Sequence, residues 1–153
     1  MKKIIFLVFW MIFTPSILAQ DSSFNPKTFA EQYFTAWTAS QAPNATEKNL
    51  ENYLALLTDD VGHQHIPYDP DDTRLPDGKQ KMREGMTHYL GKHIEYKAEF
   101  VSYSYGLNAI AIQYNVSLKA RRGPDSPIET MSYNTMEVLE IENGKVSMIR
   151  KYN

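Results

Sequence analysis

Two histidines one residue apart, His63 and His65, are the side chains of this sequence best suited to acid–base chemistry. They follow the segment Leu56-Leu57-Thr58-Asp59-Asp60, in a run that reads as a short strand. Because side chains alternate between the two faces of a strand, both imidazoles would point to the same side. An imidazole titrates near neutral pH and can take a proton from a small molecule. We therefore expect any reaction to take place beside this run.

Two other interpretations of the histidine pair remain open. Both rings could be structural, held by Asp59, Asp60 or loop carbonyl groups. Two histidines on one strand face could also bind a divalent metal, with Glu137, His88 or His93 as the third ligand. Since this spacing alone is a weak signal for metal binding, our prediction includes no metal and no cofactor.

The first 19 residues have the layout of a secretory signal peptide. Lys2 and Lys3 precede an apolar run from Ile4 to Phe13, and the small residue Ala19 follows. The run is too short for a membrane span, although an uncleaved anchor is the alternative. We predict a signal peptide over residues 1–19, a single domain over residues 20–153, and a periplasmic or secreted location.

The composition limits the kind of partner. The chain has 153 residues and a formal net charge of −2, which suits one domain and argues against binding nucleic acid or an anionic membrane. It has no cysteine, so packing rather than disulfide bonds must stabilise the exported domain.

Three amphipathic segments predict helices ahead of the strands. Asn25 and Pro26 are typical of a helix start, and apolar residues recur from Phe29 to Trp37 at helical spacing. A second stripe runs from Leu50 to Leu57, so we expect this helix to end at the aspartates. A polar loop over residues 68–78 leads to a third helix, which carries Met82, Met86 and Leu90 and stops at Gly91.

Beyond Gly91 the apolar residues alternate, which predicts antiparallel strands over residues 94–100, 110–118, 130–142 and 145–152. Asn143-Gly144 predicts a two-residue hairpin between the last two strands. With that loop, Leu139 would face Met148, and Glu137 would face Arg150. A Glu137–Arg150 ion pair would keep the carboxylate ionised and give a cavity a polar floor.

Three segments carry a resemblance to a known superfamily: Leu57-Thr58-Asp59-Asp60-Val61, Pro76-Asp77-Gly78-Lys79, and Val138-Leu139-Glu140-Ile141-Glu142-Asn143-Gly144-Lys145-Val146. In this order they resemble the nuclear transport factor 2-like superfamily, which includes SnoaL-like cyclases and ketosteroid isomerases. The resemblance implies an α+β fold: three N-terminal helices packed in the concave face of a curved, mostly antiparallel sheet, a cone-shaped barrel. It leaves function open, because the superfamily holds both enzymes and binding modules.

A comparison with the ketosteroid isomerases implies roles for single residues. Tyr33 takes the place of their hydrogen-bond-donating tyrosine on the first helix. His65 stands where their aspartate base stands, and Glu137 is the nearest match to their protonated aspartic acid. The predicted catalytic residues are thus His65, Tyr33 and Glu137, and the predicted ligand-binding residues are His63, Trp37, Tyr133 and Arg150.

The aromatic members of this set also have plainer interpretations. Tyr33 and Trp37, one helical turn apart, could be core aromatics, and Tyr133 could be core, cavity wall or sheet surface. Our first hypothesis is a cofactor-independent isomerase, cyclase or dehydratase with His65 as general base. The alternative is a non-catalytic module for ligand binding or dimerisation. The resemblance also implies a homodimer that pairs through the outer face of the sheet. We predict a small apolar or mixed-polarity molecule as the partner, because the superfamily resemblance that three segments of this chain carry implies one.

Overall fold

The structure, a computed structural model, describes residues 24–121, 123 and 125–153. The expected signal peptide lies outside these residues. Within the described part of the chain, no helix is both long enough and apolar enough to cross a membrane. The elements in chain order are α1 (Pro26–Gln41), α2 (Glu47–Leu54), β1 (Leu57–Ile66), α3 (Gly78–Tyr89), β2 (His93–Gly106), β3 (Ala109–Ala120), β4 (Glu129–Glu142) and β5 (Lys145–Tyr152).

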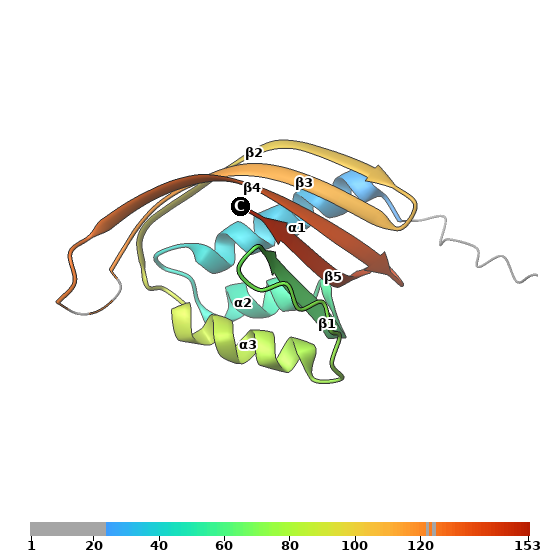
Figure 1. The fold of residues 1–153 in the computed structure, drawn as a ribbon, viewed down its shortest axis with the longest axis horizontal. Helices are drawn as coiled ribbons and strands as arrows, with labels where there is room; N and C mark the ends of the chain where they lie inside the picture. Colours follow the sequence, from blue (N-terminus) through green and yellow to red (C-terminus); the bar gives the residue numbers. More distant parts are fainter. Residues whose placement is uncertain (1–23, 122, 124) are drawn as a thin grey trace, which may run out of the picture.

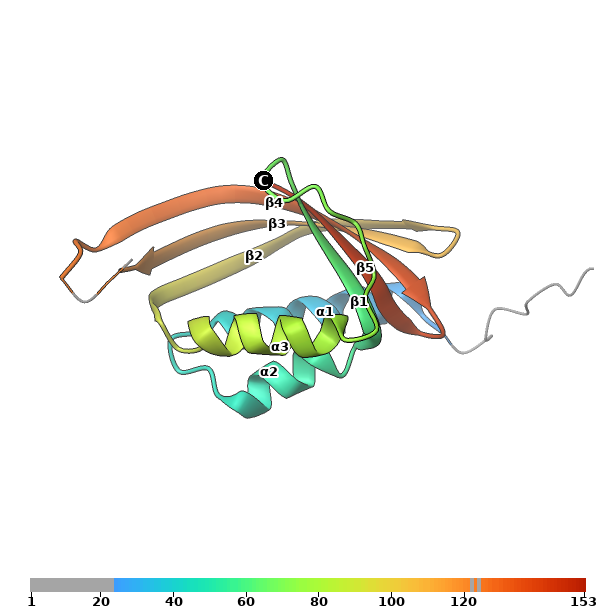
Figure 2. The same ribbon diagram turned by 60° about the horizontal axis from the view of Figure 1, so that its bottom comes forward.

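The five strands form one curved sheet in the order β1-β5-β4-β3-β2, in which only the β1–β5 pairing is parallel. Figures 1 and 2 show the three helices on the concave side of this sheet, with α1 crossing beneath the long strands. This is the predicted architecture of three helices against a curved, mostly antiparallel sheet. The core lies between the helices and the concave face.

Helix α1 begins as predicted. The side chain of Asn25 accepts a hydrogen bond from the backbone of Thr28 at 3.1 Å, and Pro26 occupies the first turn. Phe29, Ala30 and Tyr33 are the buried apolar residues of the helix, so its inner face carries the predicted stripe. Because Tyr33 is the innermost aromatic of this stripe, α1 brings a phenol into the centre of the core.

The boundary between α2 and β1 differs from the prediction. Helix α2 ends at Leu54, and the strand already begins at Leu57. Leu57 pairs with Val146 of β5, and both side chains are fully buried. The helical spacing of Leu54 and Leu57 was misleading, because two consecutive elements bury these residues in the same core. The aspartates Asp59 and Asp60 therefore belong to the strand and not to a turn before it.

The hairpin between β4 and β5 turns at Asn143-Gly144, as predicted, and both residues have positive φ angles, 51° and 74°. Ile141 pairs with Val146, but Glu140 pairs with Met148, so Ser147 is an extra residue in β5. This bulge shifts the register of all later pairs by one residue. Leu139 therefore faces Ile149, not Met148.

The same shift overturns the predicted pairing of Glu137 with Arg150. Glu137 faces Lys151 instead. A one-residue shift exchanges the two faces of a strand, so Lys151 joins the concave face and Arg150 the outer face.

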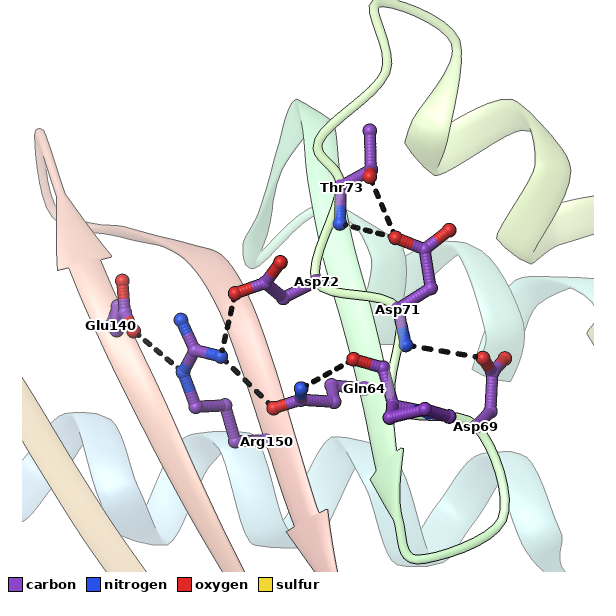
Figure 3. Close-up of polar contacts among 8 residues, drawn as sticks. Gln64, Asp69, Asp71, Asp72, Thr73, Glu140 and Arg150 are labelled. Carbon is purple, nitrogen blue, oxygen red and sulfur yellow. Dashed lines mark hydrogen bonds and ion pairs between the residues drawn. The ribbon is translucent and has the colours of Figure 1, made fainter.

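Residues 67–77, here named the strap, run along the outer side of β1 and β5 (Figure 3). Arg74 binds Asp60 and Glu142 at 2.7 Å each. Arg150 binds Glu140 of β4 at 2.9 Å and Asp72 of the strap at 3.3 Å. These ion pairs hold the strap against the sheet, on the side away from the helices.

Candidate functional site

Glu137 of β4 is the polar centre of the core, with only 2% of its surface exposed. Its Oε2 accepts a hydrogen bond from the hydroxyl of Tyr33 at 3.0 Å, and its Oε1 accepts one from Tyr114 at 2.7 Å. The hydroxyls of Tyr33 and Tyr53 lie 3.1 Å apart. Since the single hydroxyl proton of Tyr33 goes to Glu137, Tyr53 is the donor in that last contact. Helix α1, helix α2 and strand β3 thus each contribute one tyrosine to a cluster around the carboxylate.

The tyrosine cluster, made of Tyr33, Tyr53 and Tyr114, consists of strong hydrogen-bond donors that keep their protons. Burial raises the pKa of all three hydroxyls far above the usual value near 10, and the charge of Glu137 raises it further. Two charge-assisted hydrogen bonds compensate the buried carboxylate for the water it has lost. The cluster therefore fixes a negative charge inside the protein.

Lys151 of β5 is the cationic neighbour of Glu137. Its Nζ lies 3.9 Å from Oε1 of Glu137 and 5.3 Å from the centre of the Trp37 ring. Its side chain is 11% exposed. Burial lowers the pKa of the ammonium group, while Glu137 raises it, and burial is the larger effect. Lys151 therefore lies between the tyrosine cluster and the protein surface.

The two histidines of β1 lie on the far side of Lys151. His65 pairs with Lys151 across the β1–β5 ladder, so His65, Lys151 and Glu137 form a row on the concave face. The rings of His63 and His65 are 6.3 Å apart, and His65 Nε2 contacts the side-chain oxygen of Asn153. Their common orientation agrees with the predicted alternation.

His63 favours its neutral form. Burial against the surrounding protein lowers its pKa to about 4, and the positive charges of Lys151 and His65 act in the same direction. The ring is nevertheless exposed at one side, and contact with water opposes the effect of burial. The charge of Asp69 also opposes the effect of burial.

The structure brings most of the predicted site residues together. Tyr33 contacts Glu137 directly, Trp37 packs against Lys151, and His65 is the sheet neighbour of Lys151. Tyr133, two residues before Thr135 on β4, is partly buried, and burial followed by the charge of Glu137 raises its pKa. We name Trp37, His63, His65 and Lys151 the rim, because these residues lie where the buried row meets the surface.

Arg150 does not belong to this site. Its guanidinium group contacts Glu140, Gln64 and Asp72 on the outer face, as Figure 3 shows. The predicted polar floor of Glu137 and Arg150 is therefore wrong, because the bulge at Ser147 turns Arg150 outward.

Tyr33 also differs from its predicted geometry. The side chain is fully buried and its proton is used on Glu137, so in this arrangement it does not point at an open pocket. Tyr33 contacts Glu137 at one end of the row and His65 lies at the other end, with Lys151 between Glu137 and His65. The side chain in direct polar contact with His65 is Asn153, and Lys151 is the cross-strand neighbour of His65.

Sequence reasoning missed Lys151, and it did not recognise Tyr53 and Tyr114 as partners of Glu137. One signal could have revealed Lys151. Met148 and Ile149 are adjacent apolar residues, and an alternating strand with one apolar face cannot bury both on that face. Reading a bulge there would have paired Glu137 with Lys151.

The metal interpretation finds little support. Among the described residues, no three histidine, aspartate or glutamate side chains cluster in a way that could hold a metal ion. Of the possible third ligands, Glu137 is enclosed by tyrosines, and Nδ1 of His93 lies 2.7 Å from the carbonyl oxygen of Gln41.

A separate groove of about 460 Å³ lies over β2, β3 and β4. Its polar lining comes from side chains that pair across these strands: Lys97, Glu99, Asn115, Ser117, Ser132 and Asn134. Lys97, Ser117 and Ser132 form one row and Glu99, Asn115 and Asn134 the next, both on the side away from the helices. The groove is therefore distinct from the rim.

The helices, the curved sheet and the buried polar centre on its concave side define a nuclear transport factor 2-like fold. Three solved structures illustrate the likeness. A candidate SnoaL-like polyketide cyclase from Shewanella putrefaciens matches with a TM-score of 0.64 and 13% identity over 83% of this chain and 88% of its own. A nuclear transport factor 2-like protein from Anabaena variabilis matches with a TM-score of 0.63 and 17% identity over 88% and 93%. A candidate ketosteroid isomerase from Kribbella flavida matches with a TM-score of 0.57 and 18% identity over 83% and 76%.

At these identities the likeness establishes the fold and not the reaction. No family model matches the sequence, and no curated protein matches it.

Proposed function

We propose that this protein is exported and binds a small molecule at the rim, through a carbonyl or carboxylate oxygen of the ligand. The observation that carries the proposal is that the ammonium group of Lys151 lacks a hydrogen-bond partner among the described residues. Its ammonium group is largely buried, yet among the described residues it makes no hydrogen bond and contacts Glu137 only at 3.9 Å. An ammonium group has three N–H donors, so an oxygen-bearing ligand would satisfy donors that the protein leaves free.

Proton transfer is the chemistry that the rim supports best. A lysine N–H that binds a carbonyl oxygen stabilises the negative charge formed when the adjacent carbon loses a proton. A neutral imidazole can accept that proton, and His65 lies beside Lys151 in the sheet. Enolisation of this kind is a step that isomerases, cyclases and dehydratases share. We therefore propose His65 as general base and Lys151 as the oxygen-binding group, with no cofactor.

The test uses hydrogen exchange on the ligand rather than an assumed product. Ketones of increasing size, from cyclohexanone to a fused-ring aromatic ketone, are incubated with the protein in heavy water, and NMR follows the loss of their α-proton signals. Wild-type protein should accelerate exchange over buffer, and His65→Gln and Lys151→Met should each slow it. Lys119→Met, which removes an exposed cation paired with Glu95, is the control and should leave the rate unchanged.

Exchange no faster than in buffer for every ketone, or an acceleration that survives both site substitutions, would contradict the enzymatic proposal. The export proposal has its own readout. Expression with residues 1–19 present should give a periplasmic or secreted product whose mass corresponds to a chain beginning near Gln20.

The groove on the outer face favours a second candidate, a binding or dimerising module without catalysis. Its lining side chains offer hydrogen-bond donors and acceptors across β2, β3 and β4, on a sheet face that none of the described helices covers. A homodimer paired through this face should sediment at twice the monomer mass, and Asn134→Arg should convert it to monomers. Sedimentation as a monomer at micromolar concentration would exclude this mode of pairing.

A further inference from the structure

We propose that Lys151 is a nucleophilic amine that forms an imine with a small aldehyde or ketone bound at the rim. This inference rests on the proposed function, because the same site holds the ligand. It goes further in naming the substrate class and a covalent intermediate.

Lys151 and Lys79 are both largely buried, and they differ in their partners. The side chains of Lys151 and Lys79 are similarly exposed, 11% and 14%. Lys79 donates a charge-assisted hydrogen bond of 2.7 Å to Asp59. Lys151 makes no hydrogen bond within the described part of the chain, and its charged partner lies 3.9 Å away. Of these two lysines, Lys151 is therefore the one whose nitrogen has no hydrogen-bond partner among the described residues.

The partner of Lys151 is weakened by its own contacts. Oε1 of Glu137 accepts the proton of Tyr114 at 2.7 Å, and Oε2 accepts that of Tyr33 at 3.0 Å. Each hydrogen bond draws negative charge toward a phenol and away from the ammonium group. The carboxylate therefore orients Lys151 without binding it tightly.

Desolvation shifts the balance of Lys151 from the ammonium toward the neutral amine. Trp37 lies on one side, with its ring centre 5.3 Å from Nζ, and this cation–π contact favours the ammonium, whereas desolvation lowers the pKa of Lys151. Glu137 opposes this effect, and the two histidines of β1 face the same space. A lysine that loses its water in an apolar site becomes a better nucleophile, because more of it is unprotonated at neutral pH.

The reaction balances without an added oxidant or reductant. The lone pair of Nζ attacks the carbonyl carbon, the C=O π bond breaks, and a proton moves from nitrogen to oxygen to give a carbinolamine. Protonation of the hydroxyl group lets it leave as water, the nitrogen lone pair forms the C=N bond, and loss of the remaining N–H proton gives the neutral imine. Overall, one amine and one carbonyl compound give one imine and one water. A histidine at the rim can carry the proton between nitrogen and oxygen.

Reductive trapping tests this directly on the intact wild-type chain. The protein is treated with benzaldehyde, whose ring suits the Trp37 side of the rim, and sodium cyanoborohydride, which converts an imine into a stable benzylamine. Peptide mass spectrometry then measures the labelling rate of each lysine. We expect Lys151 to be labelled several-fold faster than Lys79, the internal control of similar exposure.

Labelling of Lys151 no faster than that of Lys79 would overturn the proposal, and so would labelling that excess cyclohexanone fails to reduce. No variant is needed, so a folding defect cannot obscure the result. The outcome is also separable from that of the proposed function. α-Proton exchange that depends on Lys151 without trapping would leave a hydrogen-bonding role for this residue, whereas loss of both would remove the ligand site.

Discussion

The hydroxyl of Tyr114 donates to Oε1 of Glu137 over 2.7 Å, so a phenol of β3 is joined to a carboxylate of β4 inside the apolar core. Tyr114→Phe removes this donor and leaves a buried carboxylate with one tyrosine partner. We expect the free energy of unfolding to fall by about 1–3 kcal/mol, the usual cost of a buried polar group that loses its partner. Urea denaturation measures this change in the free energy of unfolding. Tyr105→Phe is the control, because Tyr105 is 62% exposed. Equal stability of the two variants would show that the cluster contributes little.

Two glycines of α3 offer a second prediction with a built-in control. A Cβ at Gly78 would lie 2.3 Å from the carbonyl oxygen of Val61, whereas a Cβ at Gly85 would meet no described atom within 4 Å. Gly78→Ala should therefore separate α3 from β1 and destabilise the protein by about 1–3 kcal/mol. Gly85→Ala should stabilise it by about 0.5–1 kcal/mol, because alanine favours the helix. Thermal or urea unfolding of both variants measures these changes. If Gly78→Ala left the free energy of unfolding unchanged, the close approach of Gly78 to Val61 would not exist.

His63 should remain neutral well below pH 6. Its pKa in the folded protein is about 4, compared with 6.5 for an unperturbed histidine. NMR titration of the histidine ring protons, assigned by comparison with His63→Gln, should give a midpoint below pH 5 for this residue. A midpoint near 6.5 would show that its solvent contact outweighs burial and the neighbouring charges.

The same shift has a consequence for stability. Because the unfolded chain binds a proton at His63 between pH 6.5 and about 4 and the folded chain does not, the protein should lose stability as the pH falls through that range. Above pH 6.5 the residue contributes no pH dependence, and below about 4 both states are protonated. Urea titrations from pH 7 to 4.5 should show a smaller decline for His63→Gln than for wild type. Identical declines would contradict the shift.

The strap supplies a fourth prediction. Arg150→Met removes the contacts to Asp72, Gln64 and Glu140, all on partly exposed groups, so the free energy of unfolding should change by less than about 1 kcal/mol. Local opening should respond more strongly than global stability. Hydrogen exchange of the amides in residues 67–77 should accelerate in this variant and not in Lys119→Met. Unchanged exchange in the strap would mean that its other contacts hold it, namely those of Arg74 and the backbone pair of His65 and Asp69.

Local signals predicted most of the fold. Asn25-Pro26 correctly predicted the start of α1, Gly91 the end of α3, and Asn143-Gly144 the last hairpin. Each of these positions depends on backbone geometry that few residues adopt. The α2–β1 boundary failed for the opposite reason. Leu54 and Leu57 are both buried by tertiary packing, and a burial pattern alone does not say whether a helix or a strand achieves it.

The site was harder to predict than the fold. Tyr33 and Glu137 were predicted to belong to one site, and they share a hydrogen bond. Their partners Tyr53 and Tyr114 come from other elements, and only the packing of α2 and β3 brings them together. Lys151 was missed for a more specific reason, because its orientation depends on a single extra residue in the ladder.

That extra residue, Ser147, determines which of two adjacent basic residues, Arg150 or Lys151, faces the concave side of the sheet. Without it, a guanidinium, which stays protonated at any physiological pH, would stand inside the domain next to Glu137, and the lysine would face the strap. With it, the interior holds an amine, the one basic group of the two that can give up its proton. Inserting or deleting one codon in this hairpin would therefore change the kind of chemistry available to the protein while leaving its architecture in place.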